Sequence, residues 1–320
     1  MTALVLVENL VRIFDISKPF LNRLIERLPK AKVTAVNTVS FEIKEGEVYG
    51  LVGESGSGKS TIGKILVGLL GPSNGKVEIE GVDLFRETDP KKLDHIRSDI
   101  QMIFQDPYAS LNPRWRVRDI IEEPVSARGG DTNGLAEKLL EQVGLPPADA
   151  SKYPHEFSGG QRQRICIARA LASKPRFIVC DEPTSALDVS IQAQVLNLMS
   201  ELREELNLTY LFISHDLTVV RHMADKVGVL YLGQLVEEAP RDQLFDNPKH
   251  PYTKMLLEAA PKLDGFEREA EIPTGEIPDP VNPPTGCVFH PRCPNAVVNC
   301  SVEVPKPRQL GKTKVACHLA

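Results

Sequence analysis

The glycine-rich stretch Gly53–Ser60 has the residue types and spacing of a phosphate-binding loop. Its sequence, GESGSGKS, matches G-x-x-x-x-G-K-[ST] and lies between an apolar segment and an expected helix, which is the context that the motif requires. Glycines let backbone N–H groups turn inward around phosphate oxygens, and the helix N-terminus adds the positive end of its dipole. The predicted nucleotide contacts here are Gly53, Glu54, Ser55, Gly56, Ser57, Gly58, Lys59, Ser60 and Thr61.

Basic, hydroxyl and carboxylate groups around this loop could bind and cleave a phosphoanhydride. Lys59 can reach the β- and γ-phosphates, and Ser60 can give its hydroxyl to Mg²⁺. Further along the chain, the apolar run RFIVCDE ends in Asp181 and Glu182. The first carboxylate can hold Mg²⁺ and the second can polarise an attacking water. Alone, this pair would be typical of a strand that ends in an acidic turn, but behind a phosphate loop it indicates catalysis.

Two more polar residues follow apolar, strand-like segments. His215 comes after LFIS, where its side chain could touch the γ-phosphate and sense its loss. Gln105 comes after MIF, where it could contact both Mg²⁺ and the water. In isolation, a histidine at a strand end is more often structural. The functional interpretation of His215 and Gln105 therefore depends on the phosphate loop found earlier in the chain.

A second predicted anion site lies in the segment FSGGQRQRICIARALA. Ser158 is a good N-cap, and Gly159 and Gly160 leave the first N–H groups of a helix unshielded. One nucleotide does not need two such helix starts in one chain. We therefore predict that two chains pair head to tail, with each phosphate loop facing Ser158–Gln161 of the other. The alternative is an ordinary capped helix.

Strand-like apolar segments alternate with helical stretches along most of the chain, which predicts an α/β core with a parallel sheet. A helical region is inserted at about 106–173. The composition changes after about residue 260, where a proline-rich linker precedes a tail that we expect at 261–320. The segment PFLNRLIERLPKAK, Pro19–Lys32, carries a basic amphipathic stripe. This stripe could cover its own domain or contact a membrane partner.

The composition excludes several classes of protein. Apolar residues make up 42% and charged residues 25% of the chain, as in ordinary globular proteins. A net charge of −5 argues against a nucleic-acid-binding surface. No apolar run approaches the ~20 residues of a membrane-spanning helix. The N-terminus resembles a strand and not a signal peptide, so we expect a cytosolic chain.

Four of the six cysteines cluster in the tail and could bind a metal. Cys287, Cys293, Cys300 and Cys317 would suffice for a Cys₄ zinc site or an iron–sulfur cluster. The tight C-x-x-C pairs that zinc knuckles favour are absent, and free thiols in a tail that packs without metal are the third possibility. The other two cysteines, Cys166 and Cys180, lie in apolar runs and are expected in the core.

The motifs GESGSGKST, Gln105, FSGGQ, IVCDE, SALD and His215, in this order, resemble those of ATP-binding-cassette (ABC) ATPases. The resemblance implies a P-loop NTPase (RecA-like) core with an antiparallel β subdomain and an inserted helical subdomain. It also implies a dimer that closes on two ATP molecules and opens after hydrolysis to ADP and phosphate. The residue roles that it implies are Glu182 as general base, Asp181 as Mg²⁺ partner, His215 as γ-phosphate switch, Ser185–Asp188 as a loop across the dimer interface, and Phe14 (with Phe20 nearby) as adenine contact.

Further segments, among them NPKHPYTKMLLEAAP and NPPTGCVFHPRCP, resemble the ATPase subunits of bacterial oligopeptide and dipeptide importers. This resemblance implies a [4Fe-4S] cluster on the tail cysteines, with zinc as the alternative. It implies two membrane permease subunits, an extracytoplasmic binding protein, and a second ATPase subunit that is either different or identical. The chain would then lie on the cytoplasmic face of the inner membrane. Nickel, glutathione or oligosaccharide cargo, or a soluble ABC ATPase without permease, are the alternatives.

Overall fold

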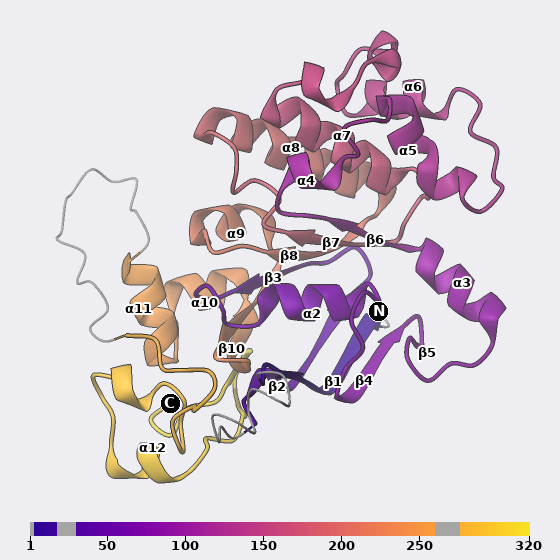
Figure 1. Ribbon diagram of the computed structural model, residues 1–320. Coiled ribbons are helices and arrows are strands. Elements are labelled where there is room, and N and C mark those ends of the chain that lie inside the picture. Colours follow the sequence, from indigo (N-terminus) through magenta and orange to yellow (C-terminus); the bar gives the residue numbers. More distant parts are fainter. Residues whose placement is uncertain (1–2, 18–29, 260–275) are drawn as a thin grey trace, which may run out of the picture.

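Two β-sheets and three groups of helices make up the computed structural model, which describes residues 3–17, 30–259 and 276–320. Figure 1 shows the larger sheet in the middle, a helical region on one side of it and the smaller sheet on the other. Phe20, the apolar positions of the predicted basic stripe and the expected boundary at 260/261 lie outside the described residues. Those predictions therefore stay open.

The smaller sheet is antiparallel and has the strand order β2-β1-β4-β5. Its long strands contain both buried and exposed positions, as expected for a sheet with one solvated face, and register shifts interrupt the strict alternation. Val5 and Val7, for example, are buried while Glu8 and Asn9 are exposed. The bounds of its strands are β1 (Ala3–Asp15), β2 (Lys32–Lys44), β4 (Asn74–Ile79) and β5 (Val82–Asp83).

The larger sheet has the strand order β11-β12-β10-β9-β3-β8-β7-β6, and the five strands from β9 to β6 are parallel. Strands β3, β7 and β8 are buried at every position, because helices cover both faces of a parallel sheet. The carboxyl ends of β3, β6, β7 and β8 therefore meet at one edge. The bounds are β3 (Val48–Val52), β6 (Ile100–Ile103), β7 (Phe177–Asp181), β8 (Thr209–Ile213), β9 (Lys226–Tyr231) and β10 (Gln234–Pro240).

Helices cover the two faces of the larger sheet and divide the apolar interior into two cores. Helix α2 packs against β7 and β8 on the side of the smaller sheet, and α9 packs against β3 on the other side. Successive residues of one strand enter different cores, as Phe177 and Ile178 do in β7. The bounds are α2 (Lys59–Leu66), α3 (Pro90–Ser98), α8 (Val189–Leu206) and α9 (Leu217–Met223).

The segment between β6 and β7 is helical (Figure 1). Its longest helix, α7, buries Ile165, Cys166 and Ile167 and contacts α5, α6 and α8. The elements are α4 (Pro107–Ser110), α5 (Val117–Ser126), α6 (Leu135–Gln142), η1 (Pro147–Ser151), η2 (Pro154–Glu156) and α7 (Gly159–Leu171).

The C-terminal segment packs on the larger sheet and also extends it. Strand β12 pairs antiparallel with β10, and β11 pairs with β12. Phe289 is buried and its ring packs against Tyr231 and Tyr252, with ring centroids 5.3 and 5.4 Å apart. The elements of this segment are α10 (Arg241–Asp246), α11 (Pro251–Ala259), η3 (His290–Arg292), α12 (Val298–Val302), β11 (Arg308–Leu310) and β12 (Thr313–Val315).

The prediction of a [4Fe-4S] cluster in the tail is corrected by the structure. Among the described residues, one group of metal-ligating side chains converges within 4.8 Å, namely Glu80, His95 and Asp99, and no cysteine belongs to it. The zinc alternative fails on the same ground, because four thiolates about 2.3 Å from one zinc ion lie about 3.8 Å apart.

Cys287, Cys293, Cys300 and Cys317 are free thiols. Burial raises the pKa of the Cys287 and Cys293 thiols. The tail is anchored by aromatic packing instead. Cys166 and Cys180 are buried in the core, as predicted.

His250, at the junction with the tail, should make stability depend on pH. It is buried, it accepts a hydrogen bond from the backbone N of Tyr252 (3.0 Å), and desolvation lowers its pKa from 6.5 to about 4. Between pH 6.5 and 4, His250 is protonated in the unfolded chain but stays neutral in the folded chain. We therefore expect the free energy of unfolding to fall between pH 6.5 and 4, by at most about 3 kcal/mol.

Urea denaturation at a series of pH values measures this effect. His250→Gln keeps an acceptor for Tyr252 but cannot titrate, so its unfolding free energy should change less over the same range. Equal slopes for the variant and the wild-type chain would assign the acid sensitivity to other groups.

Candidate functional site

The glycines of the Gly53–Ser60 loop are required by its close approach to neighbouring backbone. Gly53 has φ +151°, and a Cβ there would lie 2.1 Å from the carbonyl oxygen of Leu230. Gly58 has φ +105°, and its Cβ would lie 2.2 Å from the carbonyl oxygen of Ala35. No larger residue fits at either position, so the loop is held tightly between β2 and the end of β9.

Lys59 opens helix α2 and bends back over the loop. Its Nζ donates to the carbonyl oxygens of Gly53 (2.7 Å) and Glu54 (3.0 Å), and only 5% of the residue is exposed. Burial lowers its pKa, while the nearby carboxylates of Glu182 and Asp181 act in the opposite direction. The ammonium is therefore placed inside the curve of the loop, where a polyphosphate would need a positive charge.

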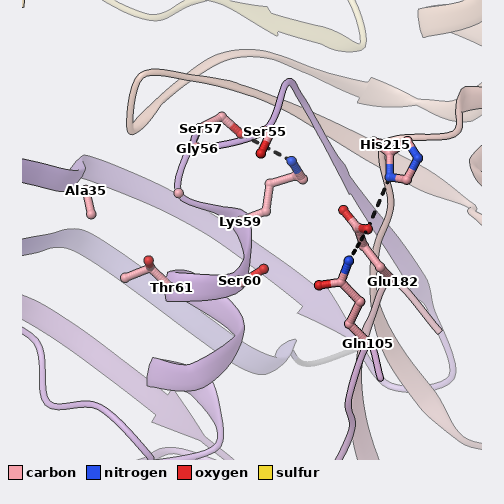
Figure 2. Close-up of a pocket in the computed structure, with 11 residues that line it drawn as sticks. Ala35, Ser55, Gly56, Ser57, Lys59, Ser60, Thr61, Gln105, Glu182 and His215 are labelled. Carbon is pink, nitrogen blue, oxygen red and sulfur yellow. Dashed lines mark hydrogen bonds and ion pairs between the residues drawn. The ribbon is translucent and has the colours of Figure 1, made fainter. Parts of the chain in front are cut away.

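A cavity of about 510 Å³ opens between this loop and the carboxyl ends of β6, β7 and β8 (Figure 2). The sequence predicted ten of its eleven lining residues, and Ala35 of β2 is the addition. The lining residues are Ala35, Ser55, Gly56, Ser57, Gly58, Lys59, Ser60, Thr61, Gln105, Glu182 and His215.

Three predicted catalytic residues meet at a single oxygen on one wall of the cavity. Gln105 Nε2 donates to Glu182 Oε2 at 2.9 Å, and His215 Nδ1 lies 3.2 Å from the same oxygen (Figure 2). Glu182 has φ +48°, a backbone strain that often marks functional positions. Its backbone N–H donates to the carbonyl of Ile213 at 2.9 Å. The carboxylate is thus oriented and can accept a proton from a water in the cavity.

Ser60 and Asp181 form a direct hydrogen bond below the loop, from Ser60 Oγ to Asp181 Oδ1 at 2.8 Å. Burial raises the pKa of Asp181, and the bond from Ser60 opposes that shift. Hydroxyl, carboxylate and amide oxygens are the ligands that Mg²⁺ prefers. Together with the amide oxygen of Gln105, these residues therefore fit a magnesium ion bound to a nucleotide.

The predicted second anion site is a well-formed helix start. Ser158 Oγ accepts from the backbone N of Gln161 (3.4 Å), and Gln161 Oε1 accepts from the backbone N of Ser158 (3.0 Å). A Cβ at Gly160 would lie 2.4 Å from Ile191 Cγ2, which fixes α7 against α8. None of the residues Ser158, Gly159, Gly160 and Gln161 lines the cavity of its own chain. Ser158 and Gln161 are exposed.

Five other predicted site residues also lie outside the cavity lining, namely Gly53 and Glu54 in the loop, Asp181 at the end of β7, Asp188 and Phe14. Asp188 is the exposed N-cap residue of α8. Phe14 in β1 is half-buried, and the guanidinium of Arg12 lies over its ring at 4.6 Å. Their predicted contacts, across a dimer interface and with adenine, therefore stay predictions.

Sequence reasoning missed two side chains that hold the loop from the C-terminal side. The hydroxyl of Tyr252 accepts from the backbone N of Glu54 at 2.9 Å. Arg292 donates to both carboxylate oxygens of Glu54, at 2.7 and 2.9 Å. These partners are 198 and 238 positions away in sequence, so no local motif could have indicated them.

Comparisons with protein families agree with this geometry. Residues 36–185 match the family model described as ABC transporter, and residues 236–300 match the model described as oligopeptide/dipeptide transporter, C-terminal region. The oligopeptide transport ATP-binding protein AppF of Bacillus subtilis (strain 168) is 50% identical over 322 residues, 98% of each chain. The di/tripeptide transport ATP-binding protein DppF of Pseudomonas aeruginosa (strain UCBPP-PA14) is 47% identical over 295 residues, 91% of each chain.

A solved structure has a similar fold. It is a dimeric post-hydrolysis state of the ATP-binding cassette MJ0796 bound to ADP and Pi, with 30% sequence identity and a TM-score of 0.62. The match covers 74% of this chain and 98% of the other. The phosphate loop, the strand-end residues and the helix start at Ser158 are therefore found on a cassette fold.

Replacing Lys59 by Ala should weaken ATP binding by on the order of 100-fold, because a buried charge opposite the phosphates is lost. Equilibrium binding of ATP to the purified full-length chain measures the change. Lys64→Ala, which removes an exposed lysine of the same helix, is the matched control and should bind normally. Undiminished binding by Lys59→Ala would refute the assignment of the phosphate loop.

Proposed function

The chain belongs to the ABC transporter family of ATP-binding proteins, and from this premise we propose that it powers the uptake of di- and oligopeptides. The activity of the family is ATP hydrolysis coupled to transport, so the chain is an ATPase. The peptide cargo is supported by relatives named for oligopeptide and di/tripeptide transport and by the match of residues 236–300. The observation that carries the proposal is the convergence of Gln105 and His215 on Glu182, opposite the phosphate loop.

The proposed hydrolysis uses the groups that line the cavity. The loop and Lys59 bind the β- and γ-phosphates of ATP, and Ser60, Asp181 and Gln105 would hold Mg²⁺, which would neutralise phosphate charge. Glu182 accepts a proton as the water oxygen bonds to the γ-phosphorus and the bond to the bridging oxygen breaks. His215 lies beside Glu182, where it can contact the γ-phosphate. The products are ADP and phosphate.

A second ATPase subunit is proposed to complete the site. Ser158, Gly159 and Gly160 do not line the cavity of their own chain. Two chains arranged head to tail would place this helix start against the phosphates of the partner, with Asp188 in the loop that crosses the interface. The dimeric state of the similar solved cassette supports the pairing of two ATPase subunits. Either a copy of this chain or a homologous subunit could be the partner.

Within residues 3–17, 30–259 and 276–320, no helix is long and apolar enough to cross a membrane. We propose that the chain binds two transmembrane permease subunits at the cytoplasmic face of the bacterial inner membrane. An extracytoplasmic binding protein would deliver peptide to them. The proposed C-terminal extension, which contains Cys287, Cys293, Cys300 and Cys317, packs on the ATPase core through Phe289. Its support is the match of residues 236–300 to a transporter C-terminal region.

Replacing Glu182 by Gln should separate ATP binding from hydrolysis. The amide keeps the shape of the side chain but cannot accept a proton, so turnover should fall on the order of 10²–10⁴-fold while ATP still binds. Phosphate release measures turnover, and size-exclusion chromatography with ATP should show an accumulated dimer. Glu205→Gln, an exposed position on α8, is the control. Turnover at the normal rate in Glu182→Gln would remove Glu182 from the proposed mechanism.

Transport itself is tested in a strain that lacks the gene. Uptake of radiolabelled di- and tripeptides should be lost and should return with the wild-type gene but not with a Lys59→Ala copy. Affinity purification from detergent extracts should recover permease subunits with the chain. Normal peptide uptake in the deletion strain, or an absence of membrane subunits from the purified material, would contradict the proposed function.

A further inference from the structure

The C-terminal tail contacts the phosphate loop through Arg292 and Glu54. Arg292 ends the short helix η3 and donates two parallel hydrogen bonds, at 2.7 and 2.9 Å, to the carboxylate of Glu54. Only 4% of the Arg292 side chain and 22% of the Glu54 side chain are exposed. Water and salt therefore screen this pair much less than they screen a surface ion pair.

Aromatic residues hold the guanidinium of Arg292 in place. Its Nη1 lies 3.4 Å from the hydroxyl of Tyr231, and its Cζ lies 5.8 Å from the centre of that ring. Phe289, three residues earlier, packs against Tyr231 and Tyr252. The bonds to Glu54 raise the pKa of Arg292 further, so the side chain stays charged. The tail thus presents a fixed positive charge to the loop.

Glu54 is held at three points, and each involves a different group. Its carboxylate binds Arg292, its backbone N–H donates to the Tyr252 hydroxyl, and its carbonyl accepts from Lys59 Nζ. The residue follows Gly53, which lies so close to the carbonyl of Leu230 that no side chain would fit there. A shift of Glu54 would therefore move the loop and the lysine that bends over it.

The charge of Glu54 also matters to a polyphosphate. A carboxylate in a loop that surrounds phosphate oxygens repels them, and like charges in a partly desolvated site interact strongly. Arg292 cancels that charge from the outer side of the loop. It does not line the cavity, so it acts through Glu54 and not on the nucleotide itself.

We propose that Arg292 is a positioning residue for ATP, which holds the phosphate loop and neutralises Glu54, so that the C-terminal tail is a working part of the nucleotide site. This inference rests on the proposed ATPase function. It predicts that the tail affects ATP affinity more than the hydrolytic step, because Arg292 contacts none of Gln105, Glu182 and His215.

The test is a double-variant comparison in the full-length chain, with the Kd for trinitrophenyl-ATP measured in the presence of Mg²⁺. Arg292→Gln should raise the Kd by on the order of 10-fold, because Glu54 is left uncompensated. KM for ATP should rise likewise, with kcat within about 2-fold of the wild-type value. Adding Glu54→Gln to Arg292→Gln should restore the Kd to within about 2-fold of Glu54→Gln alone.

A merely structural role for Arg292 makes the opposite prediction. The double variant would then bind ATP as weakly as Arg292→Gln, and that result, or an unchanged Kd in folded Arg292→Gln, would overturn the inference. Arg308→Gln is the control, because Arg308 lies in the same tail but donates to the carbonyls of Cys317 and Ala320. Its Kd should not change.

Misfolding of the variant and failure of the proposed ATPase function can each be distinguished from failure of this inference. If Arg292→Gln does not fold, Arg292→Met replaces it, since methionine keeps an unbranched side chain but loses both the charge and the two-point contact. A raised Kd in folded Arg292→Met supports the inference and an unchanged Kd overturns it. A wild-type chain that binds no ATP would refute the proposed function itself, whereas a variant effect that fails to appear refutes only the role of Arg292.

Discussion

The parallel pairing of β3, β8, β7 and β6 is the constraint on which the site depends. Because these strands run in one direction, the residues that follow them emerge at one edge: the phosphate loop, His215, the Asp181–Glu182 pair and Gln105. Strands β3, β7 and β8 are buried at every position, so the core on both faces of the sheet holds this edge in place. A proton acceptor, Glu182, and a phosphate-binding loop are thereby held on opposite walls of one cavity, although they lie far apart in the sequence.

Much of this edge could be predicted from the sequence because its signals are local. The glycine spacing of Gly53–Ser60 and the polar residues that end apolar runs need only a few neighbouring positions to be recognised. The resemblance to ABC ATPases then supplied the roles of Glu182 and His215. Ala35 could not be predicted, because nothing in β2 shows that its carbonyl limits the space at Gly58.

The tail shows where spacing alone misleads. Four cysteines within a short stretch suggested a metal because residue types and spacing do not report the distances between sulfur atoms. The folded tail instead relies on Phe289 and Arg292, which lie in the segment NPPTGCVFHPRCP, but the segment itself does not indicate their partners. Their partners, Tyr231, Tyr252 and Glu54, come from the strand, the helix and the loop of the ATPase core.

The short hairpin of β11 and β12 also has a consequence for handling the protein. Strand β12 covers the edge of β10, whose backbone would otherwise present unpaired N–H and C=O groups. The hairpin itself ends the sheet with a strand of three exposed residues, which is a poor template for further pairing. A chain truncated before residue 308 would therefore expose the unpaired edge of β10 and would be prone to aggregate. A loss of activity in such a truncated chain could be mistaken for a catalytic role of the tail.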